Sequence, residues 1–134
     1  MTKVYQIIRK YPLTTLILVI IWILCFMPIP ETPLSKISFI DKWTHIVMYF
    51  GLCIVMWGEY LWKNGNINKH DVFLWIFIAP TLMGGLIEIL QENCTNGMRS
   101  GDWMDFLADA AGVVIAQLIG IPLAMYFSTR RKDC

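Results

Sequence analysis

The sequence has few charged residues and lacks the common catalytic motifs. Of its 134 residues, 16% are Asp, Glu, Lys or Arg and two are His, whereas 57% are hydrophobic. The mean hydropathy of +0.56 is too high for a soluble domain of this length. No CxxC, HExxH or GxSxG stretch occurs, so the familiar thiol-redox, zinc-protease and serine-hydrolase signatures are missing. The composition indicates a membrane protein.

Apolar residues are gathered in four stretches that together take up well over half of the chain. These stretches are Leu13–Pro30, Trp43–Trp62, Val72–Gln91 and Asp105–Phe127. About 20 apolar residues are needed to cross a hydrocarbon core of roughly 30 Å, and a helix satisfies its own backbone hydrogen bonds there. We therefore predict an all-α integral membrane protein with four transmembrane helices, forming a single domain over residues 1–134. No small-x-small cleavage site follows the first stretch, which we interpret as a retained anchor.

The distribution of Lys and Arg predicts the orientation. With the N-terminus inside, eight of these residues fall on the cytoplasmic side: Lys3, Arg9, Lys10, Lys63, Lys69, Arg130, Arg131 and Lys132. Three fall outside: Lys36, Lys42 and Arg99. Because cytoplasmic loops carry an excess of Lys and Arg, both termini are predicted to be cytoplasmic in a multi-pass protein of the bacterial cytoplasmic membrane.

The last apolar stretch carries a packing signal. Ala108, Gly112, Ala116 and Gly120 recur every four residues, a spacing that lets two membrane helices approach closely. The same helix face includes Asp105 and Asp109. These acids are therefore predicted to point into the helix bundle.

Three further residue types lead to narrower expectations. Pro80 predicts a kinked or closely packed third helix, and Glu59 is interpreted as a surface acid that snorkels toward water. Cys25 and Cys94 both fall near the outer face, which leaves a disulfide open, but unpaired thiols are the favoured interpretation.

Polar residues collect at the predicted outer ends of three helices. Asp41, His45 and Tyr49 are spaced by four residues, Glu88 and Gln91 are one turn apart, and Asp102, Asp105 and Asp109 open the fourth helix. Ionisable groups at a membrane boundary are costly unless paired or hydrated, so we interpret this set as a candidate site. With the neighbouring basic residues and Ser100, the candidate ligand-binding residues are Asp41, Lys42, His45, Tyr49, Glu88, Gln91, Arg99, Ser100, Asp102, Asp105 and Asp109.

Three segments of the same set resemble the VanZ-like family of small bacterial membrane proteins. They are Asp41–Gly51 (DKWTHIVMYFG), Glu88–Gln91 (EILQ) and Arg99–Asp109 (RSGDWMDFLAD), in the family's order and within residues 41–112. The family is named after a teicoplanin-resistance phenotype rather than a reaction. The resemblance implies an accessory role in the cell envelope that lowers susceptibility to glycopeptide antibiotics.

Three hypotheses about activity stay open at this point. In the first, the outer site binds a lipid head group or a lipid-linked cell-wall intermediate, with Arg99 and Lys42 taking phosphate or carboxylate. In the second, the protein is a membrane enzyme acting on such a lipid, and its acid–base pair is His45 with a carboxylate, the candidates being Glu88, Asp102 and Asp105. In the third, the protein is a structural partner in an envelope complex, and the acids serve only in helix–helix recognition.

Simpler roles for single residues also stay open. Arg99 could pair with Asp102 or Glu88, Asp41 could cap a helix, and Tyr49 could be an interfacial aromatic. A lone His with carboxylates could hold a divalent cation, but no second His is predicted outside, so neither a metal nor another cofactor is expected.

Overall fold

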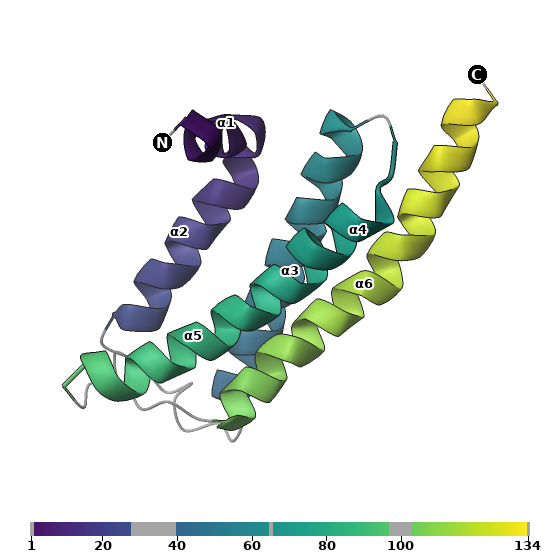
Figure 1. Cartoon of the computed structure of the whole chain (residues 1–134). Helices are drawn as coiled ribbons and strands as arrows, with labels where there is room; N and C mark the ends of the chain where they lie inside the picture. Colours follow the sequence, from purple (N-terminus) through teal and green to yellow (C-terminus); the bar gives the residue numbers. More distant parts are fainter. Residues whose placement is uncertain (1, 28–39, 65, 97–102, 134) are drawn as a thin grey trace.

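The computed structural model describes residues 2–27, 40–64, 66–96 and 103–133, and the part of the chain that it describes is helical and contains no strand. The helices are α1 (Thr2–Lys10), α2 (Pro12–Phe26), α3 (Ile40–Lys63), α4 (Lys69–Val72), the π-helix η2 (Phe73–Ile78), α5 (Ala79–Cys94) and α6 (Trp103–Lys132). Figure 1 shows α2, α3, α5 and α6 side by side along one bundle, with α1 lying across its upper end.

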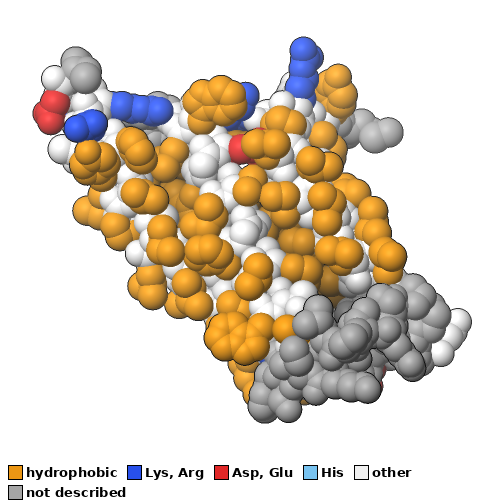
Figure 2. All heavy atoms as spheres, turned by 180° about the vertical axis from the view of Figure 1, so that it is seen from behind, with side chains coloured by type: hydrophobic (Ala, Val, Ile, Leu, Met, Phe, Trp, Pro, Cys, Tyr) orange, Lys and Arg blue, Asp and Glu red, His pale blue; other side chains and the backbone are white. Residues whose placement is uncertain are grey.

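Three segments are long and apolar enough to cross a membrane: Ile40–Lys63, Lys69–Cys94 and Trp103–Lys132. They agree with the second, third and fourth predicted spans. Both chain termini lie at the same end of the bundle (Figure 1), and eight of the nine described Lys and Arg residues lie at that end. We call it the basic end, and we call the opposite end, where α3 and α6 begin and α5 ends, the acidic end. Figure 2 shows hydrophobic side chains over the middle of the molecule.

The first predicted span is confirmed only in part. The helix over this region, α2, has 15 residues and is therefore about 22 Å long. It becomes a possible span only together with α1, from which it is bent by 100°. The bend has a local cause, because Pro12 begins α2 and disfavours the helical conformation at Tyr11, which has φ −124° and ψ 67°.

Glu59 ties α2 to α3, which corrects the interpretation of this residue as a surface acid. Its side chain is buried, and its two carboxylate oxygens accept hydrogen bonds from the backbone N–H groups of Leu13 at 2.8 Å and Thr14 at 2.9 Å. The first N–H groups of a helix have no partner within the helix, and they attract negative charge. Glu59 therefore caps the start of α2 from the neighbouring helix instead of reaching toward water.

The helix predicted to be kinked or closely packed at Pro80 has a π-helix before the proline, and other helices contact it there. Pro80 has no N–H to donate to Ile76 four residues earlier, and the turn before it is the π-helix. The carbonyl oxygen of Ile76 instead accepts from Gln117 Nε2 at 3.0 Å, while Gln117 Oε1 accepts from Trp57 Nε1 at 3.0 Å. A backbone group left without a helical partner in this candidate span is thus satisfied by a side chain of α6.

The small-residue stripe of α6 faces the bundle, as predicted. Ala108, Gly112, Ala116 and Gly120 are all buried. A Cβ atom on Gly112 would lie 2.5 Å from the carbonyl oxygen of Ile46, and one on Gly120 would overlap the Trp57 ring. Close approach of α6 to α3 therefore depends on these glycines, and it fixes how the acids at the start of α6 meet α3.

The cysteines that the structure describes form no disulfide. Cys25 is buried near the end of α2, whereas Cys94 is exposed at the end of α5. No disulfide joins them, in agreement with the favoured interpretation.

Candidate functional site

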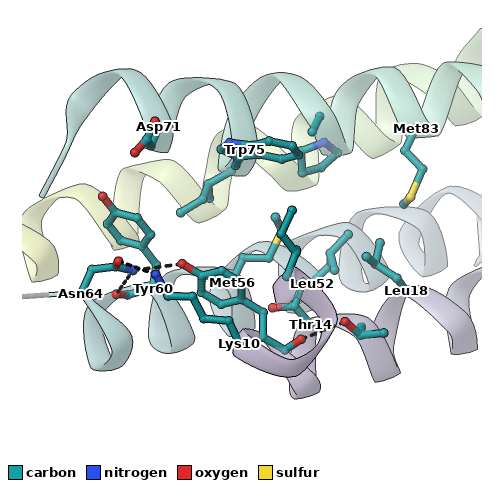
Figure 3. Close-up of a pocket in the computed structure, with 16 residues that line it drawn as sticks. Lys10, Thr14, Leu18, Leu52, Met56, Tyr60, Asn64, Asp71, Trp75 and Met83 are labelled. Carbon is teal, nitrogen blue, oxygen red and sulfur yellow. Dashed lines mark hydrogen bonds between the residues drawn. The ribbon is translucent and has the colours of Figure 1, made fainter. Parts of the chain in front are cut away.

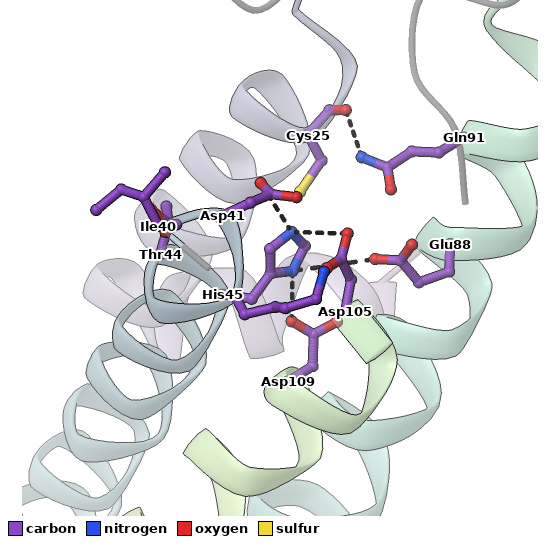
Figure 4. A network of polar contacts seen from close by, with 10 residues as sticks. Cys25, Ile40, Asp41, Thr44, His45, Glu88, Gln91, Asp105 and Asp109 are labelled. Carbon is purple, nitrogen blue, oxygen red and sulfur yellow. Dashed lines mark hydrogen bonds and ion pairs between the residues drawn. The ribbon is translucent and has the colours of Figure 1, made fainter. Parts of the chain in front are cut away.

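Three helices bring charged side chains together at the acidic end. The first turns of α3 supply Asp41, Lys42 and His45, the last turns of α5 supply Glu88, and the first turns of α6 supply Asp105 and Asp109. We call these six residues the acidic cluster. Figure 4 shows His45 in its middle, with carboxylates on several sides.

The imidazole of His45 faces carboxylates through both ring nitrogens. On one side, Nδ1 is hydrogen-bonded to Asp109 Oδ1 at 2.7 Å and lies 3.9 Å from Glu88 Oε1. On the other side, Nε2 lies 3.8 Å from Asp105 Oδ2 and 4.0 Å from Asp41 Oδ1. A neutral imidazole has one N–H and can donate on one side only, whereas the protonated ring can donate on both.

Lys42 forms the second ion pair of the cluster. Its Nζ donates to Asp105 Oδ1 at 2.8 Å, which connects the first turn of α3 to the first turn of α6. The pair is mostly buried, so the desolvation of both groups must be offset by this contact and its neighbours. Both strong contacts of the cluster thus join α3 to α6.

The cluster is buried at one side and reaches solvent at the other. Asp109 is 1% exposed and His45 2% exposed, whereas the side chain of Asp41 is 52% exposed. Because α3 begins at Ile40, Asp41 lies in its first helical turn rather than ahead of the helix. A ligand at the acidic end would therefore meet Asp41 first and His45 behind it.

Glycine makes room for the most deeply buried acid. A Cβ atom on Gly84 would lie 2.9 Å from Asp109 Oδ2, so a larger residue at this position of α5 would displace the carboxylate. That oxygen is buried and has no hydrogen-bond partner among the described residues, and the same holds for the hydroxyl of Tyr49. Burying such groups without partners is costly, which is typical of sites kept for function.

Two residues predicted for the site have different surroundings. Gln91 is buried, but its Nε2 donates to the carbonyl oxygen of Cys25 at 2.7 Å, so it joins α5 to the end of α2 and reaches toward Cys25 (Figure 4). Tyr49 is fully buried one turn below His45, so it is a core residue rather than an interfacial aromatic. Arg99, Ser100 and Asp102 lie outside the described residues.

The geometry also bears on metal binding. His45 with Glu88 and Asp109, and His45 with Asp41 and Asp105, are two groups whose donor atoms lie within 4.8 Å of one another. Imidazole and carboxylate donors suit divalent transition metals. The expectation of no metal at this end stays a prediction.

Gln117, Trp57 and Glu59 are polar core residues that the sequence did not assign to a site. A signal for Gln117 exists, since it falls two small-residue repeats beyond Asp109 on the same face of α6, and Pro80 implies an unbonded carbonyl somewhere opposite. Gln117 and Pro80 thus belong to the packing in the middle of the bundle rather than to the acidic cluster.

Comparisons with known proteins return no relative: no family model, no curated protein and no solved structure matches the chain. The resemblance to the VanZ-like family therefore depends on the three sequence segments quoted above.

Proposed function

We propose that the chain is an envelope membrane protein of the VanZ-like type whose acidic cluster binds the head group of an envelope lipid or a lipid-linked cell-wall intermediate at the outer leaflet. The observation that carries the proposal is the placement of His45, which has carboxylates from α3, α5 and α6 around both ring nitrogens. Ionisable groups inside a membrane protein are rare and mark ligand or proton sites by default.

The charges of the cluster favour particular head-group chemistry. Four of its six residues are acids, so it is suited to accept hydrogen bonds from amines or hydroxyls of a ligand. Lys42 already donates to Asp105, which makes it a poor choice for binding phosphate. Recognition of a phosphate or carboxylate is therefore assigned to Arg99, whose planar fork can bind either group with two hydrogen bonds.

The test is mass spectrometry of the lipids that copurify with the protein. Asp41→Asn removes the exposed acid of the cluster, and we expect it to lower lipid retention without unfolding the protein. Glu92→Gln, which changes an exposed acid on the last turn of α5, is the matched control and should retain lipid like the wild type. Equal lipid content in wild type and Asp41→Asn would contradict the proposal and favour an acidic cluster that only joins helices.

Arg99 separates binding of an anion from simple charge neutralisation. If Arg99 binds phosphate or carboxylate, Arg99→Lys should weaken both lipid retention and glycopeptide tolerance, because an ammonium group cannot reproduce the two-point contact. Wild-type behaviour of Arg99→Lys in both assays would contradict this assignment.

A second candidate function, a membrane enzyme, is favoured by one contact. The 2.7 Å hydrogen bond between Asp109 and His45 resembles the arrangement in which a carboxylate orients a His that acts as general acid or base. The distinguishing measurement is turnover of the copurified lipid in a sealed vesicle. Turnover that disappears in His45→Gln while lipid binding persists would favour the enzyme, whereas binding without turnover in the wild type would favour the binding protein.

A further inference from the structure

A separate cavity opens at the basic end of the bundle. It has a volume of about 420 Å³ and lies between α2, α3 and the η2–α5 segment (Figure 3). This volume falls within the roughly 300–1,000 Å³ that is usual for ligand pockets. Its inner part is apolar and is lined by Leu18, Leu52, Met56, Ile76 and Met83.

The mouth of this cavity is polar and carries one charge of each sign. Lys10 and Asp71 lie on opposite sides of it (Figure 3). Lys10 Nζ donates to Asn64 Oδ1 at 2.9 Å, and Asn64 Nδ2 donates to the Tyr11 hydroxyl at 3.0 Å, which holds the cation at the rim. The side chain of Asp71 is 49% exposed. Charges at one end and an apolar channel behind them match the chemical layout of a phospholipid.

The helix next to the mouth, α1, has the features of a helix that lies at a membrane interface. α1 is bent by 100° from α2 and lies across the end of the bundle, with Val4, Tyr5 and Ile7 exposed beside the basic residues Lys3 and Arg9. Such a short helix with exposed apolar and basic side chains is typical of the membrane interface. Trp75, also exposed at the mouth, fits the aromatic belt at the same level.

We propose that this cavity holds one acyl chain of an amine-bearing glycerophospholipid, with the lipid phosphate at Lys10 and the amine at Asp71. The charge pair at the mouth distinguishes this occupant from an anionic lipid without an amine, which Asp71 would repel. The cavity shares no residue with the acidic cluster, so this lipid site does not depend on the proposed function of that cluster.

The first test fills the cavity and measures lipid retention by native mass spectrometry of the full chain in an equimolar mixture of phosphatidylethanolamine and phosphatidylglycerol. We expect the wild type to keep one phosphatidylethanolamine per chain and Ala79→Trp, inside the cavity, to lose it. Leu82→Trp, three residues along the same helix and 68% exposed, is the control and should keep the lipid. Equal retention by wild type and Ala79→Trp, or preferential retention of phosphatidylglycerol by the wild type, would overturn the proposal.

The second test needs no change in packing. Asp71→Asn should lower the ratio of bound phosphatidylethanolamine to phosphatidylglycerol about threefold, the effect expected from losing one partly exposed ion pair. Asp133→Asn, an exposed acid at the same end, should leave the ratio unchanged. An unchanged ratio in Asp71→Asn would overturn the assignment of the amine to this carboxylate.

Discussion

The two ends of the bundle handle charge in opposite ways. At the acidic end, His45, Asp105 and Asp109 are buried between helices and are paired with one another or with Lys42. At the basic end, most Lys and Arg side chains lie on the outside, as Figure 2 shows along its upper edge. Water solvates each surface charge, so such a charge needs no protein partner. A buried charge loses this solvation and must be compensated by neighbouring charges and hydrogen bonds. The acidic end should therefore be sensitive to single substitutions, and the basic end should tolerate them.

The largest expected effect comes from separating α3 and α6, because the contacts of His45 with Asp109 and of Lys42 with Asp105 would then be lost. Gly112→Leu places a side chain where even a Cβ atom would lie 2.5 Å from the Ile46 carbonyl oxygen. We expect loss of the folded bundle, or destabilisation by about 3 kcal/mol or more. Ile115→Leu, half exposed on the same helix, is the control. Equal thermal unfolding of the two variants in detergent would contradict this packing.

The next effect is expected within the cluster itself. Asp109→Ala leaves His45 without its 2.7 Å partner in a buried position, and removing one partner of a buried pair typically costs about 3 kcal/mol. Thermal or denaturant unfolding in detergent measures the loss. Asp133→Ala, the matched change at the basic end, should alter stability by less than about 0.5 kcal/mol. A similar loss of stability in Asp109→Ala and Asp133→Ala would contradict the expectation that the acidic end is more sensitive to substitution than the basic end.

Glu59 tests whether burial or location decides the effect of a substitution, because it is a buried acid near the basic end. Glu59→Ala leaves the first N–H groups of α2 without their acceptor, and loss of a helix cap costs about 1 kcal/mol. We expect a smaller fall in melting temperature than for Asp109→Ala, with local loosening of α2 visible as faster amide hydrogen exchange at Leu13 and Thr14. Wild-type exchange at these two amides would show that the cap does not hold α2.

The smallest effect on the structure is expected from single cysteine substitutions. Their labelling tests which side of the membrane each end of the bundle faces. In a variant without native cysteines, a cysteine at Ser100 should react with an impermeant thiol reagent in intact cells, and one at Asn66 should not. The reason is the excess of Lys and Arg at the basic end. The reverse pattern would place the acidic cluster on the cytoplasmic side and contradict a site at the outer leaflet.

Features that depend on local patterns were predictable from the sequence. α3, the α4–η2–α5 segment and α6 follow from apolar length alone, because a helix in a membrane satisfies its own backbone. The burial of Asp105 and Asp109 follows from the helical period, which puts them on the same face as the stripe that includes Gly112. The predicted first span fails in part for a local reason too, since Pro12 restricts Tyr11 and the chain bends there.

Only the tertiary structure decided which polar groups became partners. Spacing put Asp105 and Asp109 on one face of α6. The close approach of α3 and α6 decided that Asp109 is hydrogen-bonded to His45 and Asp105 to Lys42. Gln91 and Glu59 show the same limit, because each bonds a backbone group of α2 that no sequence period connects to it. Helix formation depends on neighbours within four residues, whereas these contacts join residues 45 to 66 positions apart. Their choice depends on how rigid helices pack, which the order of residues in one helix does not specify.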